Sequence, residues 1–176
     1  MLVTFAKLTT PLPEIAAALN TWENDPLLVP LIRPNRSKDE LEQPVRVTVE
    51  SLTERMEHQT TYLMYVEGQL VGEMNYQIDP RHLFKKVAGT AWIAITIGEA
   101  HARGKGVGAQ AMRYLEDQIR EQGLTRIELG VFEFNANAIK LYKKMGYQEI
   151  GRIDDFTYWH GKMWPDIRME KYPDAG

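Results

Sequence analysis

The stretch Arg103-Gly104-Lys105-Gly106-Val107-Gly108 decides how the rest of this 176-residue sequence is interpreted. It follows the apolar run Thr90-Ala91-Trp92-Ile93-Ala94-Ile95-Thr96-Ile97, which predicts a strand. It opens a segment whose apolar residues recur at helical spacing, at Val107, Ala111, Leu115 and Ile119. Glycines at a strand-to-helix junction let a ligand approach the backbone, and a helix N-terminus offers unpaired N–H groups to an anion. We therefore expect a pyrophosphate-binding loop, to which Arg103 and Lys105 add positive charge.

Two familiar kinds of phosphate loop fit this stretch poorly. A Walker A loop fails because Gly98 precedes Gly104 by six positions rather than five, and because Gly106 stands where a Ser or Thr ligates magnesium. A dinucleotide-binding fingerprint is matched from Gly104 to Ala109, and Glu128 lies about where the ribose-binding acid belongs. That fingerprint is short and weak, so a second motif has to decide.

The second motif runs from Asn135 to Tyr147, as Asn-Ala-Asn-Ala-Ile-Lys-Leu-Tyr-Lys-Lys-Met-Gly-Tyr. Together with the glycine loop it resembles the GCN5-related N-acetyltransferase superfamily over residues 90–151. Members combine an acetyl-CoA loop, Arg/Gln-x-x-Gly-x-Gly/Ala, with a later Asn-x-x-Ala-[Ile/Leu]-x-Leu-Tyr-x-x-x-Gly-[Phe/Tyr] segment. Arg103, Gly106 and Gly108 satisfy the first pattern, and one helix plus one strand separate the two motifs, as in the superfamily.

The resemblance implies an α/β (α+β) fold around a mixed, mostly antiparallel sheet of six or seven strands. A V-shaped splay is expected between the fourth and fifth strands, with about four helices flanking the sheet. Periodicity alone indicates only a mixed α/β chain. It predicts strands over 2–8, 61–66, 70–78, 90–97, 126–131, 147–158 and 166–171, and helices over 13–22, 38–43, 51–59, 106–122 and 136–145. A capping box at Ser51–Glu54 is expected to open the helix over 51–59.

Acetyl-CoA is the co-substrate that the resemblance implies. Its pyrophosphate is expected at the backbone of the loop residues Arg103, Gly104, Lys105, Gly106, Val107, Gly108 and Ala109. Its pantetheine arm is expected to pair with the main chain of Ile95, Thr96 and Ile97, one of whose N–H groups faces the thioester oxygen. Asn135 is a helix N-cap by residue type, and the resemblance also assigns it to the pantetheine or the pyrophosphate. Whether it is more than a cap stays open.

Two residues are the catalytic candidates. Tyr142 falls inside the second motif, and its reference pKa of about 10 keeps it protonated, so it can serve as a general acid for the departing thiolate. The alternative is a core aromatic, because Ala138, Leu141 and Met145 share its helical spacing. Many superfamily members carry a glutamate on the strand before the glycine loop, but residues 91–98 contain no acid. Glu73 on the preceding strand is the candidate base, with a chain of waters as the alternative; Glu99 and His101 are expected to face solvent.

The implied reaction moves an acetyl group from acetyl-CoA to a primary amine of a small molecule or peptide, by direct attack in a ternary complex. The alternative is a catalytically idle module that binds acyl-CoA as a sensor or scaffold. The acceptor is left open, because the segments that build its site carry no motif. Their acids and aromatic side chains suit a cationic amine; they are Trp22, Glu23, Asp25, Arg33, Asp154, Asp155, Tyr158, Trp159 and Trp164.

Bulk composition narrows the class of protein. A net charge of −3 argues against a nucleic-acid binder, and no apolar run approaches the roughly 18 residues of a membrane span. The first ten residues lack the basic segment of a signal peptide, and the absence of cysteine excludes disulfides and thiol catalysis. The histidines show no metal-ligand spacing. We expect a single N-acetyltransferase domain over 1–176, cytoplasmic, metal-free and bound to neither membrane nor nucleic acid, with a homodimer left open.

Overall fold

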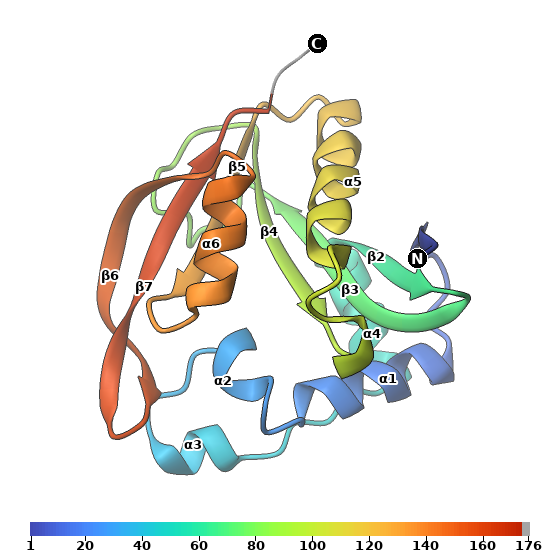
Figure 1. The fold of residues 1–176 in the computed structure, drawn as a ribbon, viewed down its shortest axis with the longest axis horizontal. Helices are drawn as coiled ribbons and strands as arrows, with labels where there is room; N and C mark the ends of the chain where they lie inside the picture. Colours follow the sequence, from blue (N-terminus) through green and yellow to red (C-terminus); the bar gives the residue numbers. More distant parts are fainter. Residues whose placement is uncertain (174–176) are drawn as a thin grey trace.

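A seven-stranded sheet forms the centre of the computed structural model, which describes residues 1–173 (Figure 1). The strand order is β1-β2-β3-β4-β5-β7-β6, and every neighbouring pair is antiparallel except β4 and β5. The strands are β1 (Val3–Lys7), β2 (Thr60–Val66), β3 (Gln69–Ile78), β4 (Thr90–Ile97), β5 (Arg126–Phe132), β6 (Gln148–Trp159) and β7 (Lys162–Lys171). The predicted mixed, mostly antiparallel sheet is confirmed.

Helices cover both faces of the sheet. They are α1 (Pro13–Glu23), α2 (Val29–Ile32), α3 (Lys38–Glu42), α4 (Val49–His58), α5 (Val107–Glu121) and α6 (Ala136–Lys144), with a 3₁₀ turn η1 (Ala100–Ala102) before α5. The four longest helices and the short α3 were all predicted from the sequence, whereas α2 was not. Helices α5 and α6 both begin at the end of the sheet where β4 and β5 separate (Figure 1). No helix within residues 1–173 is both long and apolar enough to cross a bilayer.

The two faces have separate cores. On the α5 face, Ala111, Met112, Leu115 and Ile119 of the helix are fully buried against the sheet. On the opposite face, which we call the α4 face, Leu19, Trp22, Leu52 and Leu63 form a second cluster. Burial of a large aliphatic side chain contributes about 1.5–3 kcal/mol. The apolar residues that recur at helical spacing in α5 are therefore the ones that pack into the core on the α5 face.

Helix α4 begins earlier than the sequence pattern indicated. Its N-cap is Thr48, whose hydroxyl accepts from the N–H of Ser51 at 3.1 Å, while the Ser51 hydroxyl accepts from the N–H of Thr48 at 2.9 Å. The capping box expected at Ser51–Glu54 is wrong, because Ser51 is the third helical residue of this reciprocal pair rather than its cap.

The parallel pair β4–β5 is short. Its ladder runs only from Thr90–Arg126 to Trp92–Glu128. Beyond Trp92 the strand β4 continues to Ile97 without a partner on that side. The predicted splay between the fourth and fifth strands is confirmed.

Candidate active site

The unpaired edge of β4 forms the middle of the candidate site. A central strand of a seven-stranded sheet is normally buried, yet Ala94 is exposed and residues 95–97 are only half-buried. The ladder with β3 pairs Ile95 with Met74, Thr96 with Glu73 and Ile97 with Gly72, so β4 is held firmly from one side only. On its other edge the main-chain groups of residues 95–97 do not pair with β5, and an unpaired strand edge of this kind can accept an extended ligand.

The glycine loop leaves open space at the N-terminus of α5. Gly104 has φ 72° and Gly106, the N-cap of α5, has φ 80°, a region that other residues rarely adopt. A Cβ built on either glycine would meet no heavy atom within 4 Å. No side chain caps the first turn of α5, so its N–H groups are without a helix partner. This arrangement fits a phosphate group.

Arg103 has a different role from the one its charge indicated. Its guanidinium donates through Nε to the carbonyl of Ile97 at 3.0 Å and through Nη2 to the carbonyl of Gly98 at 2.8 Å. The side chain therefore ties the loop to the end of β4. Lys105 is exposed in the loop.

Val107 and Gly108, in the first turn of α5, pack against the protein interior. Val107 is 1% exposed and belongs to the core, so only its main chain can serve a ligand. A Cβ on Gly108 would lie 3.1 Å from Leu141 Cδ2 on α6 and 3.7 Å from Ile97 Cδ1 on β4. Glycine at this position lets α5, α6 and β4 converge on one point.

Asn135 is the N-cap of α6. Its side-chain oxygen accepts from the N–H of Ala138 at 3.4 Å. The helix ends at Lys144 with Met145 as its C-cap, and Gly146, which follows, has φ 95°, the left-handed conformation at which helices commonly stop. The cap role of Asn135 is thus present, whatever further contact it makes.

Tyr142 lies half-buried on α6 against the α5-face core. Burial raises the pKa of its hydroxyl to about 12. Its ring centroid lies 6.0 Å from that of Tyr147. Within the described residues the Tyr142 hydroxyl forms no hydrogen bond, whereas that of Tyr147 donates to the buried carboxylate of Glu116 at 2.8 Å. The Tyr142 hydroxyl is therefore protonated at neutral pH and is free, within the described residues, to donate a hydrogen bond to a ligand.

Glu73 lies on the α4 face, on the strand next to the open edge. It pairs across the sheet with Thr96 on one side and Leu63 on the other, and Asn75 Nδ2 donates to its Oε2 at 3.2 Å. The pKa of the Glu73 carboxyl is raised from 4.5 to about 7, chiefly by burial; the hydrogen bond from Asn75 and the charge of Arg55 oppose this rise, and the charge of Glu23 adds to it. A carboxyl with this pKa can both take and release a proton near neutral pH.

Trp22 and Glu99 join α1 to the end of β4. The Trp22 ring lies so close to Gly98 that no Cβ fits there, and its Nε1 donates to Glu99 Oε1 at 3.2 Å. Glu99 is therefore half-buried, and the expectation that it faces solvent is wrong, because the buried indole needs an acceptor. Trp22 is 2% exposed and belongs to the interior. His101, on η1, is exposed as expected.

The other acceptor-side candidates divide into engaged and exposed groups. Glu23 is bound by Arg55 of α4 through two hydrogen bonds of 2.6 and 2.8 Å. Asp25 accepts from the N–H of Leu27, and Arg33 donates to the carbonyl of Gln43. Fully exposed acids remain on β6, at Asp154 and Asp155.

The β6–β7 hairpin carries an aromatic cluster and is bound to the segment after α2. The rings of Trp159 and Trp164 lie 5.7 and 5.4 Å from Phe134, and Trp164 Nε1 donates to the carbonyl of Trp159. Tyr158 donates its N–H to the carbonyl of Asn35, whose own N–H donates to Thr157 Oγ1 at 3.0 Å. The two acceptor-side segments of the sequence are therefore one connected structure.

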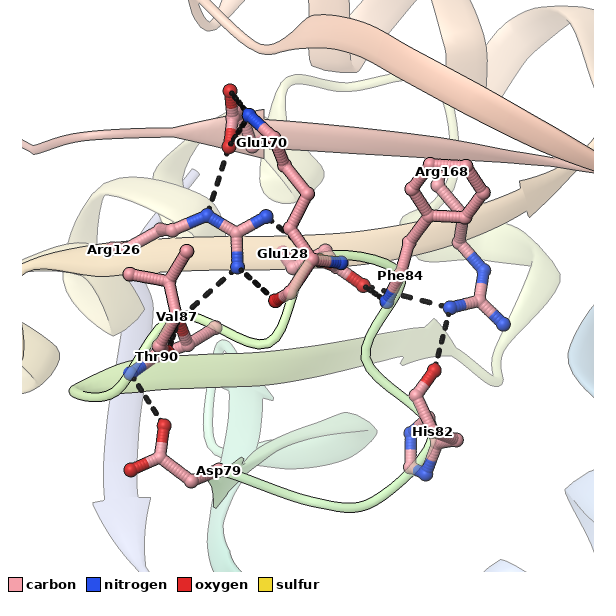
Figure 2. Close-up of polar contacts among 10 residues, drawn as sticks. Asp79, His82, Phe84, Val87, Thr90, Arg126, Glu128, Arg168 and Glu170 are labelled. Atoms are coloured by element: carbon pink, nitrogen blue, oxygen red, sulfur yellow. Dashed lines mark hydrogen bonds and ion pairs between the residues drawn. The ribbon is translucent and has the colours of Figure 1, made fainter.

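A buried ionic network lies where β4 and β5 are still paired (Figure 2). Arg126 donates to Glu128 at 2.7 Å and to Glu170 at 2.8 Å, and Arg168 lies 3.5 Å from Glu128. Glu128, with no exposed surface, also accepts from the N–H groups of Phe84 and Lys85 in the β3–β4 loop. The ribose-binding role that a dinucleotide fingerprint would give Glu128 is therefore wrong.

This network was not predicted, although the sequence carries a signal of it. Arg126 and Glu128 stand two residues apart in an otherwise apolar strand, and Arg168 and Glu170 stand two residues apart in β7. Residues at this spacing share one face of a strand, and charges on a buried face must be paired. Within residues 1–173 no group of three or more His, Asp or Glu side chains is arranged to hold a metal ion.

Comparison with known proteins agrees with this geometry. Residues 19–147 match the family model described as "Acetyltransferase (GNAT) family". The chain is 34% identical over 92 residues to a probable spermine N(1)-acetyltransferase of Bacillus subtilis subsp. natto (strain BEST195), a match that covers 52% of this chain. The matched region spans 60% of the length of that relative.

Solved structures share the fold at low sequence identity. A putative acetyltransferase, YncA, from Salmonella typhimurium, solved with acetyl-CoA, aligns with a TM-score of 0.77 at 17% identity, over 99% of this chain and 95% of its own. A spermidine N-acetyltransferase from Vibrio cholerae, solved with CoA and spermine, gives 0.73 at 16%, over 97% and 95%.

Proposed function

This chain belongs to the acetyltransferase (GNAT) family, and we propose that it transfers an acetyl group from acetyl-CoA to a primary amine by direct attack while both substrates are bound. The observation that carries the proposal is the open edge of β4 beside an uncapped, glycine-lined helix N-terminus. The first suits an extended amide chain and the second suits a pyrophosphate. Acetyl-CoA has both, and it supplies the activated acetyl group.

Main-chain groups are the proposed holders of acetyl-CoA. The N–H groups of Gly104 to Ala109 bind the phosphates, helped by the charge of Lys105, and Arg103 keeps the loop against β4. Ile95, Thr96 and Ile97 bind the pantetheine arm through their free edge. Asn135 lies at the start of α6 and contributes its side-chain amide in addition to its cap.

Glu73 is the proposed general base. An alkylammonium has a pKa near ~10.4, so it must lose a proton before its nitrogen can attack. With its pKa near 7, the Glu73 carboxylate receives that proton at Oε1, which accepts no hydrogen bond within residues 1–173. The nitrogen then forms the new C–N bond and loses its second proton to water as the tetrahedral intermediate collapses to the amide. An N–H of residues 95–97 stabilises the negative charge that develops on the thioester oxygen.

Tyr142 is the proposed acid at the leaving sulfur. As the C–S bond breaks, the Tyr142 hydroxyl donates to the thiolate, and the proton that Glu73 took is released to solvent. Because burial raises the pKa of Tyr142 to about 12, above the ~8.5 of a thiol, its contribution begins as a hydrogen bond to the developing thiolate. A proton from water completes the transfer.

A polyamine is the proposed acceptor class. The relative named as a spermine N-acetyltransferase supports it, as do the acids Asp154 and Asp155 on β6 and Glu73 beside the open edge. Carboxylates and aromatic rings together favour a chain that carries several positive charges.

A thiol-release assay with acetyl-CoA tests the proposal across a panel of spermine, spermidine, an amino sugar and an N-terminal peptide. We expect turnover with an amine and none with its fully N-acetylated form. If acetyl-CoA raises the melting temperature and no amine releases thiol, the chain is instead an idle acyl-CoA-binding module. If acetyl-CoA neither binds nor reacts, the proposal fails.

A further inference from the structure

Asn75 donates a hydrogen bond to Glu73, the proposed base. It follows Glu73 by two residues on β3, so both side chains lie on the α4 face. Its partner across the ladder is Ala94, the exposed residue at which β4 has lost its pairing with β5. Asn75 itself is 7% exposed, and its Nδ2 donates to Glu73 Oε2 at 3.2 Å.

This hydrogen bond engages Glu73 Oε2 and Asn75 Nδ2 and leaves one further acceptor atom on each side chain. Within residues 1–173 no donor reaches Glu73 Oε1 or Asn75 Oδ1. Within residues 1–173 the buried side-chain atom that lacks a hydrogen-bond partner is Arg33 Nε. Because Glu73 Oε1 and Asn75 Oδ1 also lack a partner and are not in this group, both oxygens are accessible to solvent. Polar atoms in a half-buried site normally have a partner. Each of these oxygens is therefore able to accept a hydrogen bond from a ligand.

We infer that Asn75 is a positioning residue for the acceptor amine: through Nδ2 it fixes the Glu73 carboxylate, and through Oδ1 it holds a second N–H of the same nitrogen. The inference rests on the proposed role of Glu73 as base. One N–H of the ammonium gives its proton to Glu73 Oε1. A second N–H donates to Asn75 Oδ1, which orients the nitrogen lone pair. No group other than the carboxylate gains a proton in this step.

The surroundings of Glu73 show what removal of Asn75 should do. Glu23 from α1 and Arg55 from α4 are the charged groups near it, and they are bound to each other. The residues that face it from β2 and β4, Leu63 and Thr96, do not titrate. Asn75 is therefore the neutral donor that favours the charged carboxylate, and its loss should make that carboxylate harder to form.

The test compares Asn75→Leu with Gln77→Leu. Gln77 lies on the same strand and face and forms no hydrogen bond to Glu73 within the described residues, so its substitution removes an equivalent polar group as a control. The Glu73 carboxyl is titrated by ¹³C NMR, assigned by its absence in Glu73→Gln. A lost hydrogen bond of ordinary strength should raise its pKa by roughly half to one unit in Asn75→Leu. Gln77→Leu should titrate like the parent.

Kinetics complete the test with the amine that gives the highest turnover. The acid limb of the kcat/KM profile should move to higher pH in Asn75→Leu by the same amount as the NMR titration, and Asn75→Ser should repeat the shift if Asn75→Leu does not fold. If an Asn75 variant shows the same Glu73 pKa and the same acid limb of the kcat/KM profile as the parent, the inference about Asn75 is wrong, while the proposed role of Glu73 still stands. A Glu73→Gln enzyme with the parent's pH profile overturns the proposed base, and this inference with it.

Discussion

The proposed acetyl-CoA side and the proposed amine side of this chain differ in the groups that they offer to a ligand. On the first side the groups offered to a ligand are main-chain N–H and C=O groups of the loop at 103–109 and of β4. On the second side they are side chains: Glu73, Asn75 and the acids of β6. A site made of backbone should tolerate changes of side chain and fail when the backbone is altered. A site made of side chains should respond to single-atom replacements.

The largest effect is expected from Gly106→Asp. The substitution forces a residue with a Cβ into φ 80° and puts a carboxylate at the anion-binding end of α5. In the parent, acetyl-CoA at 100 times its Kd should stabilise the fold by about 2.7 kcal/mol, and in the variant it should give no stabilisation. Thermal denaturation with and without acetyl-CoA measures this.

Gly123→Asp is the matched control. Gly123 has φ 78° and equally open surroundings, but it lies beyond the C-terminus of α5. The same backbone strain should lower the melting temperature there without loss of acetyl-CoA binding. Equal loss of binding in both variants would show that the glycine loop is merely a turn.

The next largest effect is expected from Tyr142→Phe. Loss of an acid at the leaving group typically costs about 10²–10⁴-fold in kcat. Stability should hold, because the Tyr142 hydroxyl has no protein partner within residues 1–173. Tyr147→Phe is the opposite case: it strips a buried hydrogen bond from Glu116 and should cost about 1–2 kcal/mol of stability at unchanged turnover. If Tyr142→Phe keeps full turnover, the residue serves packing only.

Glu73→Gln should lower kcat/KM by about 10²-fold at neutral pH. The base must be ionised to act, so the parent's activity should fall as pH drops through about 7, the pKa of Glu73. At alkaline pH the free amine needs no help, and the difference between variant and parent should shrink. A pH–rate profile from pH 6 to 10 measures both limbs. A constant ratio across that range would mean that water removes the proton.

The same variant should be more stable than the parent above neutral pH. The folded pKa of Glu73, about 7, exceeds the unfolded value of 4.5, so the native state binds more protons between these values and stability falls as pH rises through them. Gln removes this cost. The gain should be absent below pH 4.5, grow to at most about 3 kcal/mol by pH 7 and then level off. Urea denaturation at pH 4, 6 and 8 tests the sign.

The smallest effect is expected from Arg103→Gln. Because the guanidinium is already engaged with the carbonyls of Ile97 and Gly98, it contributes little charge directly to a phosphate. Affinity for acetyl-CoA should fall by less than about tenfold, the equivalent of one ordinary hydrogen bond. A loss as large as that of Gly106→Asp would mean that the side chain, rather than the main chain, holds the phosphates.

The difference between the two sides also explains what could be predicted from the sequence. A main-chain site needs glycine at fixed positions, so Gly104, Gly106 and Gly146 mark the loop and the end of α6, and each adopts a positive φ. The side-chain site has no such local requirement. Glu99 was misplaced because the indole that binds it, Trp22, stands 77 residues away in sequence.

Short elements were harder to predict for a related reason. Helix α2 has four residues and begins with a proline in its first turn, so it has too few apolar positions to show a period. The start of α4 was missed because its cap pairs Thr48 with Ser51, whereas a box is usually recognised by Glu or Gln at the later position. In α2 and at the start of α4, the backbone conformation depends on local contacts that do not produce a periodic pattern of apolar residues.

The ionic network around Glu128 fixes the point from which the unpaired edge of β4 extends, and we call this point the pivot. It clamps β4 and β5 together at Trp92–Glu128, and the arm beyond it runs to Ile97, five residues or about 17 Å away. A rotation of one degree at the pivot moves the end of that arm by about 0.3 Å. A misplacement of about 1 Å at a reacting group can cost about 10²-fold in rate. The ladder with β3 holds the other side of β4, so a shift of a few degrees among Arg126, Glu128 and Arg168 that carries β3 and β4 with it would disturb the proposed reaction, although none of these three residues lies on the unpaired edge.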